Sequence, residues 1–415
     1  MSRCALSSAE AARAALERAF RTSHGRLIAA LTRRLGAVQL AVIDNAVQDA
    51  MARALERWPS EGVPASAEGW LLRTAHNIAI DAIRRDSRLS ALPSKYEEQA
   101  ELAAPTLDDE LVLMFLCCHP SLPRAAQVAL TLKVACGFTV RQIALGFLTE
   151  EKTLAQRLVR AKQRLRSEGA HFELPAADEL PARLEPILEV LYLVFNEGYS
   201  PTDGESVIKD ELCGDALRLS RLLTKLPVTA TPAAEALRAL FCFQSSRAAA
   251  RRADDGGLLL LPEQDRGAWD RELIAEGFAC LERAASGTEL TRFHLEAGIA
   301  ACHAAAPSYG ATDWPQIVTL YDLLRERAPS PVVEVNRAVA IGMAQGALAG
   351  LDELDAIPER ELIRRYPYAL AAYAELHASL GQLDRARAYL EQALEHQQAA
   401  AQRRLLERKL ASLQR

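Results

Sequence analysis

The 415-residue sequence lacks long apolar runs, and no stretch approaches the roughly 20 residues that a helix needs to cross a bilayer. It begins with Met1-Ser-Arg-Cys-Ala-Leu6 and passes straight into an Ala/Glu/Arg-rich helical pattern, without the apolar region of a secretory signal peptide. These two absences predict a cytoplasmic protein that does not bind membranes.

Catalytic and metal-binding motifs are also missing. The chain has no Gly-rich phosphate loop, no zincin motif and no Ser/His/Asp signature. Cys117-Cys118-His119 is the one cluster among its 8 cysteines, and adjacent cysteines do not match the spacing of zinc ligands. His294, His303 and His377 are scattered on Ala-rich segments without ligand spacing. We therefore expect no catalytic residues, no metal and no cofactor, with cysteines that stay reduced and mostly buried.

Alternating strand patterns are absent as well, and nearly every segment repeats with the period of a helix. The predicted fold class is therefore all-α. Half of the residues (50%) are hydrophobic, which suffices for packed cores, and the length suits roughly two to four domains.

The charge is unevenly distributed along the chain. The first 172 residues carry 23 Lys+Arg against 18 Asp+Glu, whereas the remainder carries 26 against 36, so the net charges are +5 and −10. A basic front suits a polyanionic partner and an acidic rear does not.

Residues 138–166 are the most informative segment. Thr139 can cap a short helix over 140–145, Gly146 ends that helix, and Thr149 can cap a second one. Apolar residues of the second helix repeat at helical spacing, at Leu154, Leu158, Ala161 and Leu165. The opposite face carries Lys152, Thr153, Gln156, Arg160 and Gln163, with Arg157 and Arg164 at its edges. This pattern predicts a helix-turn-helix whose second helix enters the DNA major groove, although an amphipathic helix with a solvated face is the alternative.

Two upstream segments, Asp44–Leu55 and Gly69–Arg85, precede this motif. Together the three resemble, in the right order, bacterial sigma factors of the extracytoplasmic-function (ECF) type, and the resemblance covers about residues 10–168. The implied domains are sigma-2 over residues 1–89, a linker over 90–107, a sigma-4 helix-turn-helix domain over 108–170, a second linker over 171–185 and a C-terminal helical extension over 186–415.

The resemblance implies that core RNA polymerase and promoter DNA are partners. In the family, the helix matching Asp44–Leu55 docks on the clamp helices of the polymerase β′ subunit, and sigma-4 contacts the β flap. The matching polar positions are Asp44, Gln48, Asp49 and Arg53. Asn45 and Met51 depart from the residues common in the family at these positions. The alternative to polymerase docking is a helix that merely exposes its charged residues to water.

The next segment resembles the part of sigma-2 that reads and melts the −10 element. The implied DNA-binding residues are Trp70, Arg73, His76, Asn77, Arg84, Arg85 and Arg88. A buried stripe is expected at Leu71, Ala75, Ile78 and Ala82. Trp70 can either stack on an unpaired base, a contact worth about 1–3 kcal/mol, or pack at the start of its helix. In sigma-4 the −35 element would be bound by Lys152, Thr153, Gln156, Arg157, Arg160 and Arg164.

The rear of the chain resembles the extension of a sigma-factor subgroup with tetratricopeptide-like (TPR-like) repeats. Residues that match one repeat unit are Tyr373, Leu380, Gly381, Ala386, Leu390, Ala393 and Leu394. Gly346 lies 35 residues before Gly381, close to the period of such repeats of about 34 residues. The resemblance implies that the extension regulates the sigma factor, together with an unknown regulator.

Three hypotheses follow. The leading one is a sigma factor, not an enzyme, that directs core RNA polymerase to specific promoters. The alternative is a TPR-like peptide-binding scaffold with a degenerate sigma-like DNA-binding adaptor. A third places an enzyme site around Asn196–Tyr199, where polar residues interrupt an apolar helix, but we favour a structural hydrogen-bond network there.

Overall fold

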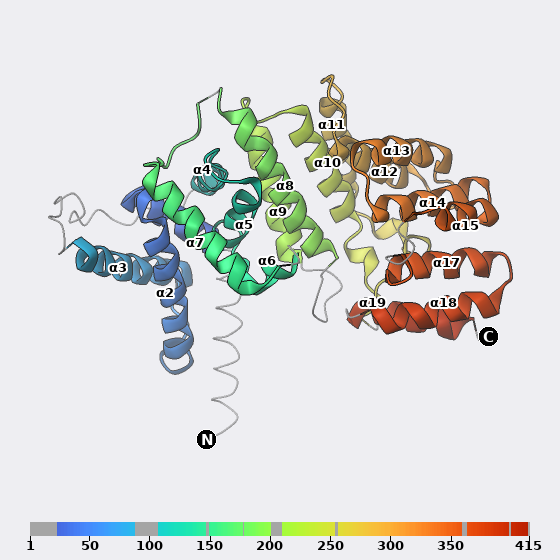
Figure 1. Cartoon of the computed structure of the whole chain (residues 1–415), viewed down its shortest axis with the longest axis horizontal. Coiled ribbons are helices and arrows are strands. Elements are labelled where there is room, and N and C mark those ends of the chain that lie inside the picture. The colour runs from blue at the N-terminus through green and yellow to red at the C-terminus, as the bar shows by residue number, and fades with distance from the viewer. Residues whose placement is uncertain are drawn as a thin grey trace. The chain divides into compact units, whose positions relative to one another are not determined.

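The computed structural model describes residues 23–87, 107–146, 149–176, 178–200, 210–253, 256–358, 363–397 and 400–413. These residues form helices joined by turns (Figure 1), and their one β-type pairing is an isolated bridge between Arg252 and Leu258. The predicted all-α fold class is confirmed. None of the described helices is long and apolar enough to cross a membrane. The chain divides into two compact units, Met1–Val194 and Phe195–Arg415.

The elements of the first unit follow one another along the chain. They are a helical segment over residues 23–35, η1 (Ala37–Gln39), α2 (Leu40–Glu61), α3 (Ala67–Ser87), α4 (Leu107–Cys117), α5 (Arg124–Val134), α6 (Val140–Gly146), α7 (Glu151–Ser167) and most of α8 (Leu180–Tyr199). Helix α8 begins within the range assigned to the second linker.

The described elements of the second unit are helices, apart from the bridge between Arg252 and Leu258. They are α9 (Asp210–Lys225), α10 (Pro232–Ser246), η3 (Ala249–Arg251), η4 (Leu261–Glu263), η5 (Arg266–Ala268), α11 (Arg271–Ala284), α12 (Arg292–Ala305), α13 (Trp314–Arg327), α14 (Pro331–Gln345), α15 (Ala347–Asp355), α17 (Pro367–Ser379), α18 (Leu383–His396) and α19 (Ala400–Ser412).

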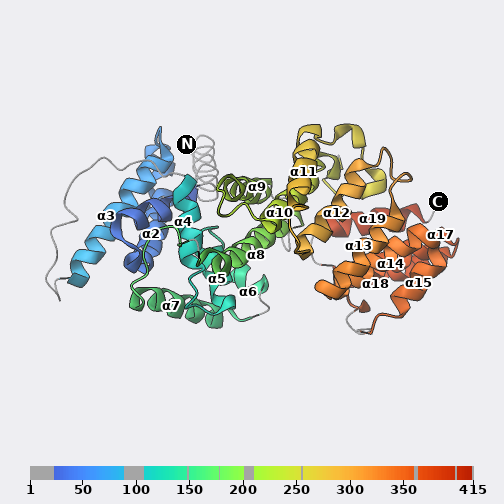
Figure 2. The ribbon, with the colours of Figure 1, turned by 90° about the horizontal axis from the view of Figure 1, so that it is seen from above.

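Helix α4 lies in the core of the first unit, close to α2 and α5 in the view from above (Figure 2). From Leu111 onward α4 is apolar on every side, and such a helix must be buried on every side. Its side chains from Leu113 to Cys117, and Cys118 after it, are all at most 1% exposed. Burial raises the pKa of the Cys118 thiol to about 12, so this thiol stays protonated and unreactive at neutral pH. Every cysteine that the structure describes is a free thiol.

Asn196–Tyr199, the polar motif that interrupts an apolar helix, lies at the end of α8 and packs against neighbouring helices. Phe195 stacks between Phe241, at a ring distance of 4.2 Å, and Tyr199, at 5.8 Å. The buried Arg251 guanidinium lies 3.5 Å from the Tyr199 ring and donates to the Tyr199 carbonyl oxygen at 2.7 Å. A Cβ at Gly198 would lie 2.8 Å from the Cys213 nitrogen, so only glycine lets α8 and α9 approach this closely. These contacts give Gly198 and Tyr199 a structural role, whereas Asn196 is exposed.

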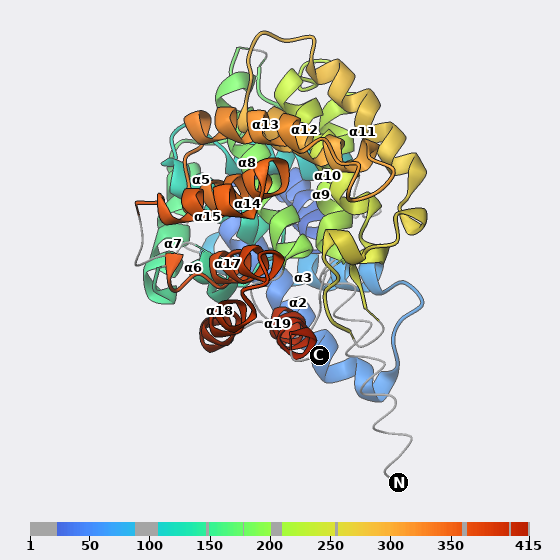
Figure 3. The same cartoon turned by 90° about the vertical axis from the view of Figure 1, so that its right-hand side faces the viewer.

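Pairs of helices make up the end of the second unit. Figure 3 shows α14 beside α15 and α17 beside α18. Gly346 and Gly381, the two glycines separated by 35 residues, occupy equivalent turns between paired helices and have positive φ angles of 106° and 73°. Glycine adopts such angles without strain, which explains the repeated residue.

Close backbone contact within the α14–α15 pair yields a first prediction. A Cβ at Gly350 would lie 2.8 Å from the Gly342 Cα and 2.9 Å from the Ala338 carbonyl oxygen. Gly350→Ala should therefore destabilise the chain by about 1–3 kcal/mol, measured by thermal unfolding followed by circular dichroism. The control is Gly214→Ala on α9, where the added Cβ meets nothing within 4 Å and should stabilise by about 0.5–1 kcal/mol. Equal unfolding temperatures of wild type and Gly350→Ala would contradict this close packing of α14 and α15.

Candidate functional site

Helix α7 is amphipathic as the sequence predicts. Its buried residues are Leu154, Leu158, Ala161 and Leu165, the four expected positions, and they pack toward α5 and α6. The rest of the helix is strongly polar, so burial of this narrow stripe fixes which face is left to solvent.

The caps of α6 and α7 differ. Thr139 caps α6, since its Oγ1 accepts from the Gln142 N–H at 3.2 Å and the Gln142 side chain accepts from the Thr139 N–H at 2.9 Å. The expectation that Thr149 caps the second helix is wrong. Helix α7 begins one residue later, with Glu150 at the N-cap position and no side-chain cap. Acidic Glu150 and Glu151 instead face the positive end of the helix dipole.

The face of α7 opposite the stripe is open to solvent. Lys152, Thr153, Gln156, Arg160, Gln163 and Arg164 are exposed, and Arg157 is half-buried. The structure thus brings all six candidate −35 residues onto one helix, beside Val159, which is 54% exposed. Arg164 also forms an ion pair with Glu168 at 2.8 Å, one turn away.

Helix α3 presents most of the candidate −10 residues. Arg73, Asn77, Arg84 and Arg85 are exposed, Trp70 and His76 are half-buried, and Arg88 lies outside the described residues. Trp70 meets the buried Trp58 of α2 edge to face, at a ring distance of 5.6 Å. Burial lowers the pKa of His76, although a hydrogen bond to Asn77 opposes the shift.

The buried stripe of α3 is only partly as expected. Leu71 and Ala75 are buried, but Ile78 and Ala82 are half-buried. The remaining buried positions are Leu72, Ala79, Ile80 and Ile83. The buried face of α3 is therefore wider than the single row that was expected. It packs against α2.

The four candidate polymerase contacts on α2 differ in their exposure to solvent. Gln48, Asp49 and Arg53 are exposed, whereas Asp44 is 1% exposed. One Asp44 oxygen accepts from the Gln48 side chain at 2.9 Å, and the other forms an ion pair with Lys162 of α7. Asp44 therefore faces α7 in this structure.

A small set of ionisable groups surrounds Asp44, of which His24 is buried and Lys133 and Lys162 are half-buried. Burial alone would raise the pKa of Asp44, but the charge of Lys162 and its hydrogen bond hold that pKa below the usual value. Burial also lowers the pKa of Lys133 and lowers the pKa of His24 to about 4, even though the charge of Asp44 opposes the shift of His24. At neutral pH this set comprises a neutral His24, one carboxylate and two lysines.

Sequence reasoning missed His24, Lys133 and Lys162. Their role comes from contacts between distant segments, since Lys162 and Asp44 are 118 residues apart. One signal was present: Lys162 lies between Leu158 and Leu165 at helical spacing, so it belongs at the edge of the buried stripe.

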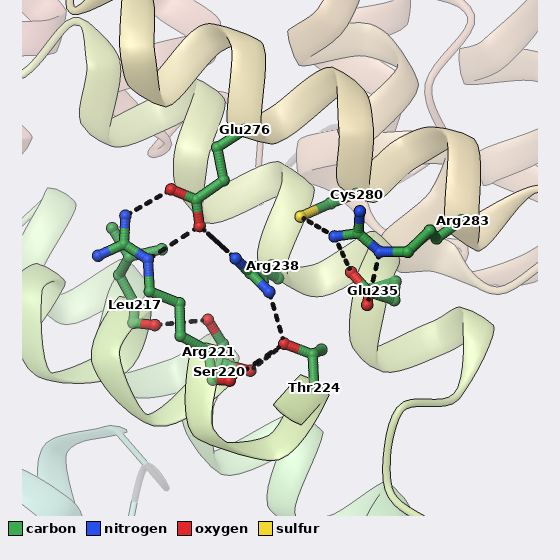
Figure 4. Close-up of polar contacts among 9 residues, drawn as sticks. All are labelled: Leu217, Ser220, Arg221, Thr224, Glu235, Arg238, Glu276, Cys280 and Arg283. Carbon is green, nitrogen blue, oxygen red and sulfur yellow. Dashed lines mark hydrogen bonds and ion pairs between the residues drawn. The ribbon is translucent and has the colours of Figure 1, made fainter. Parts of the chain in front are cut away.

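In the second unit, charged side chains join α9, α10 and α11 (Figure 4). Glu276 accepts from Arg221 at 2.8 and 2.6 Å and from Arg238 at 3.0 and 2.6 Å. Arg283 holds Glu235 through two hydrogen bonds of 2.9 and 3.0 Å, and it donates to the Cys280 sulfur at 3.1 Å. Because these charged groups hydrogen-bond to one another, we interpret the network as a structural link between the three helices rather than a catalytic centre.

Comparison with known proteins identifies parts of both units. Residues 20–89 match the family model described as Sigma-70 region 2, and residues 183–285 match a family of unknown function, DUF6596. The uncharacterized protein R00370 of Rhizobium meliloti (strain 1021) is 38% identical over 384 residues, covering 89% of this chain and 90% of that protein. The chain belongs to the family of that protein. No solved structure matches it.

The two family matches place the features described above. The sigma-2 region contains α2, α3 and the helical segment over 23–35, so this chain is sigma-factor-like. The DUF6596 region contains the motif at the end of α8 and the ion-pair network of α9, α10 and α11.

The network of the DUF6596 region predicts a pH dependence. The hydrogen bond from Arg221 lowers the pKa of Glu276 to about 2, against burial and together with Arg238. A depressed carboxyl pKa stabilises the fold above the unfolded value and loses that contribution as the pH falls toward 2. Glu276→Gln should therefore lose about 1 kcal/mol at pH 7, allowing for solvent screening, and the difference from wild type should shrink below about pH 4.

Urea unfolding of both proteins between pH 2 and pH 7 measures this difference. Glu282→Gln is the matched control, because Glu282 is exposed on the same helix. A pH-independent difference between Glu276→Gln and wild type would show that the carboxylate charge is not the stabilising feature.

Proposed function

We propose that this protein is a sigma factor of the ECF type, which binds core RNA polymerase in the cytoplasm and directs it to specific promoters. The observation that carries the proposal is the match of residues 20–89 to Sigma-70 region 2, in which α2 exposes Gln48, Asp49 and Arg53. The protein acts by recruitment, so it needs no catalytic group of its own.

In this proposal α2 and α3 have different roles, since α2 binds polymerase and α3 binds promoter DNA. The exposed face of α2 binds the clamp helices of the polymerase β′ subunit. Exposed Arg73, Arg84 and Arg85 of α3 follow the phosphates of the −10 element, while Asn77 hydrogen-bonds an exposed base. Contacts of this kind release counterions, so promoter binding should weaken steeply with salt.

We assign α4 to α7 to sigma-4, with α7 as the recognition helix for the −35 element and the β flap as its polymerase contact. The capped α6, the short connection and the exposed basic face of α7 support this assignment. Arg and Gln side chains on that face can reach base edges and phosphates, and Val159 can contact a thymine methyl group.

We assign regulation to the C-terminal extension, whose pairs α14–α15 and α17–α18 have the equivalent turn glycines of TPR-like repeats. An unknown regulator acts on it. The second candidate function, a peptide-binding scaffold, is favoured by a cavity of about 570 Å³ between α15, α17 and α18. Tyr373, His377, Arg385 and Tyr389 are among its lining residues.

Polymerase binding tests the proposal through α2. Arg53→Glu changes an exposed residue, so folding should be unaffected, while affinity for core RNA polymerase should fall about tenfold because the reversed charge meets a surface adapted to the original one. Binding is measured by fluorescence anisotropy of the labelled full chain. Arg325→Glu is the control, because it makes the same change at an exposed residue of α13. Unchanged affinity of Arg53→Glu would remove α2 from the interface, and wild type that fails to bind would favour the scaffold.

DNA recognition is tested through α7. Arg160→Glu places a negative charge on the assigned groove face, and transcription from a promoter that depends on its −35 element should drop by roughly tenfold to a hundredfold. Polymerase binding without DNA should stay at the wild-type level, which separates the two roles. Wild-type promoter output from Arg160→Glu would contradict the assigned face, and Arg325→Glu again serves as the control.

A further inference from the structure

We propose that Cys242 of α10 and Cys280 of α11 form a redox-active thiol pair, which hydrogen peroxide oxidises to a disulfide. The pair lies in the DUF6596 region, and both side chains are 0% exposed. This inference is independent of the proposed sigma-factor role, because it concerns chemistry within the second unit.

The two cysteines lie where α10 packs against α11. At one end of this contact, Arg283 of α11 holds Glu235 of α10 through hydrogen bonds of 2.9 and 3.0 Å. At the other end, a Cβ at Gly277 of α11 would lie 2.7 Å from the Phe243 ring of α10. In each helix the cysteine lies between these two points along the chain, so the contact between the helices runs past both sulfurs.

Cys280 has the surroundings of a reactive thiolate. Its sulfur accepts a hydrogen bond from the Cys242 thiol and another from the Arg283 guanidinium, the latter at 3.1 Å (Figure 4). The hydrogen bond from Cys242 lowers the pKa of Cys280. The charges of Arg238 and Arg283 act in the same direction, whereas burial and the charge of Glu235 oppose the shift. Cationic neighbours of this kind stabilise the thiolate, which is the nucleophilic form of cysteine.

The thiols elsewhere in the described part of the chain differ in this respect. The hydrogen bond to Cys280 raises the pKa of Cys242, so Cys242 keeps its proton. Burial raises the pKa of four further thiols, those of Cys117, Cys118, Cys213 and Cys302. Cys280 is therefore expected to react first, with Cys242 as the second thiol that completes the disulfide.

A cavity gives a small oxidant access to this sulfur. It has a volume of about 510 Å³, and Glu235, Arg238 and Arg283 are among its lining residues. The side chain of Arg283 is 49% exposed and contacts the Cys280 sulfur. Exposed side chains change rotamer within nanoseconds, so a rotation of Arg283 alone opens the sulfur to a molecule as small as hydrogen peroxide.

The oxidation takes two steps. The Cys280 thiolate attacks one oxygen of hydrogen peroxide, the O–O bond breaks, an S–O bond forms, and the departing hydroxide takes up a proton to become water. Cys242 then attacks the Cys280 sulfur, the S–S bond forms and the S–O bond breaks, and the departing hydroxide leaves as water with the proton of Cys242. Two thiols are oxidised and one peroxide is reduced by two electrons.

Peroxide treatment of the folded full chain tests the proposal directly. The remaining thiols are alkylated in denaturant after treatment, and the peptides are mapped by mass spectrometry. We expect a disulfide between Cys242 and Cys280 as the first product, and dithiothreitol should restore both thiols. Complete alkylation of both cysteines, or oxidation of other cysteines before this pair, would overturn the proposal.

Arg283→Gln tests the activation of Cys280. The disulfide should form about tenfold more slowly, because the thiolate loses a charged donor. Arg325→Gln makes the same change at an exposed residue of α13 and should react like wild type. Circular dichroism establishes that both variants are folded. An equal or higher rate for Arg283→Gln than for wild type would overturn the assignment of Cys280 as the activated thiol.

Two cysteine variants test the order of the steps. In Cys242→Ala the sulfenic acid at Cys280 has no partner thiol, so dimedone, which reacts with sulfenic acids, should label Cys280. In Cys280→Ala dimedone should not label Cys242, because burial still raises the pKa of that thiol. Label on Cys242 and none on Cys280 would overturn the assigned roles.

Discussion

The ion pair between Asp44 and Lys162 is the contact that fixes where α7 meets α2 in the first unit. A carboxylate that is 1% exposed must be paired, because an isolated buried charge is far more costly than any single hydrogen bond. This requirement brings the recognition-helix candidate α7 to the polymerase-helix candidate α2. Two functions that the sequence assigns to separate domains therefore meet at one contact, and neither helix can be understood without the other.

Features set by local spacing could be predicted from the sequence. The helical period identified an all-α chain and the four buried residues of α7, and Thr139 identified the cap of α6. The repeat spacing related Gly346 to Gly381, and the structure places both in turns between paired helices. Features set by contacts between distant segments could not be predicted in this way. Asp44 has the sequence signature of a surface residue, and only the approach of Lys162 from 118 residues away buries it.

Small errors at helix ends have the same origin. Thr149 and Glu150 are both acceptable near a helix start, but the Thr149 N–H donates to the Ala144 carbonyl oxygen at 3.0 Å and α7 begins at Glu151. In α3, contact with α2 widens the buried face beyond one row, so Ile78 and Ala82 remain half-buried. The second unit shows a related case. Its polar motif at Asn196–Tyr199 was predicted to form a structural hydrogen-bond network, but Asn196 is exposed, and Tyr199 is held instead by stacking on Phe195 and by the Arg251 guanidinium.

We propose above all that the chain gives core RNA polymerase its choice of promoter. The most direct measurement is transcription in vitro from a pool of genomic promoters, with core polymerase alone and with the full chain added, followed by mapping of the transcript starts. If the chain is a sigma factor, a small set of new start sites that share upstream elements should appear only with the chain present. Start sites identical to those of core polymerase alone would contradict it.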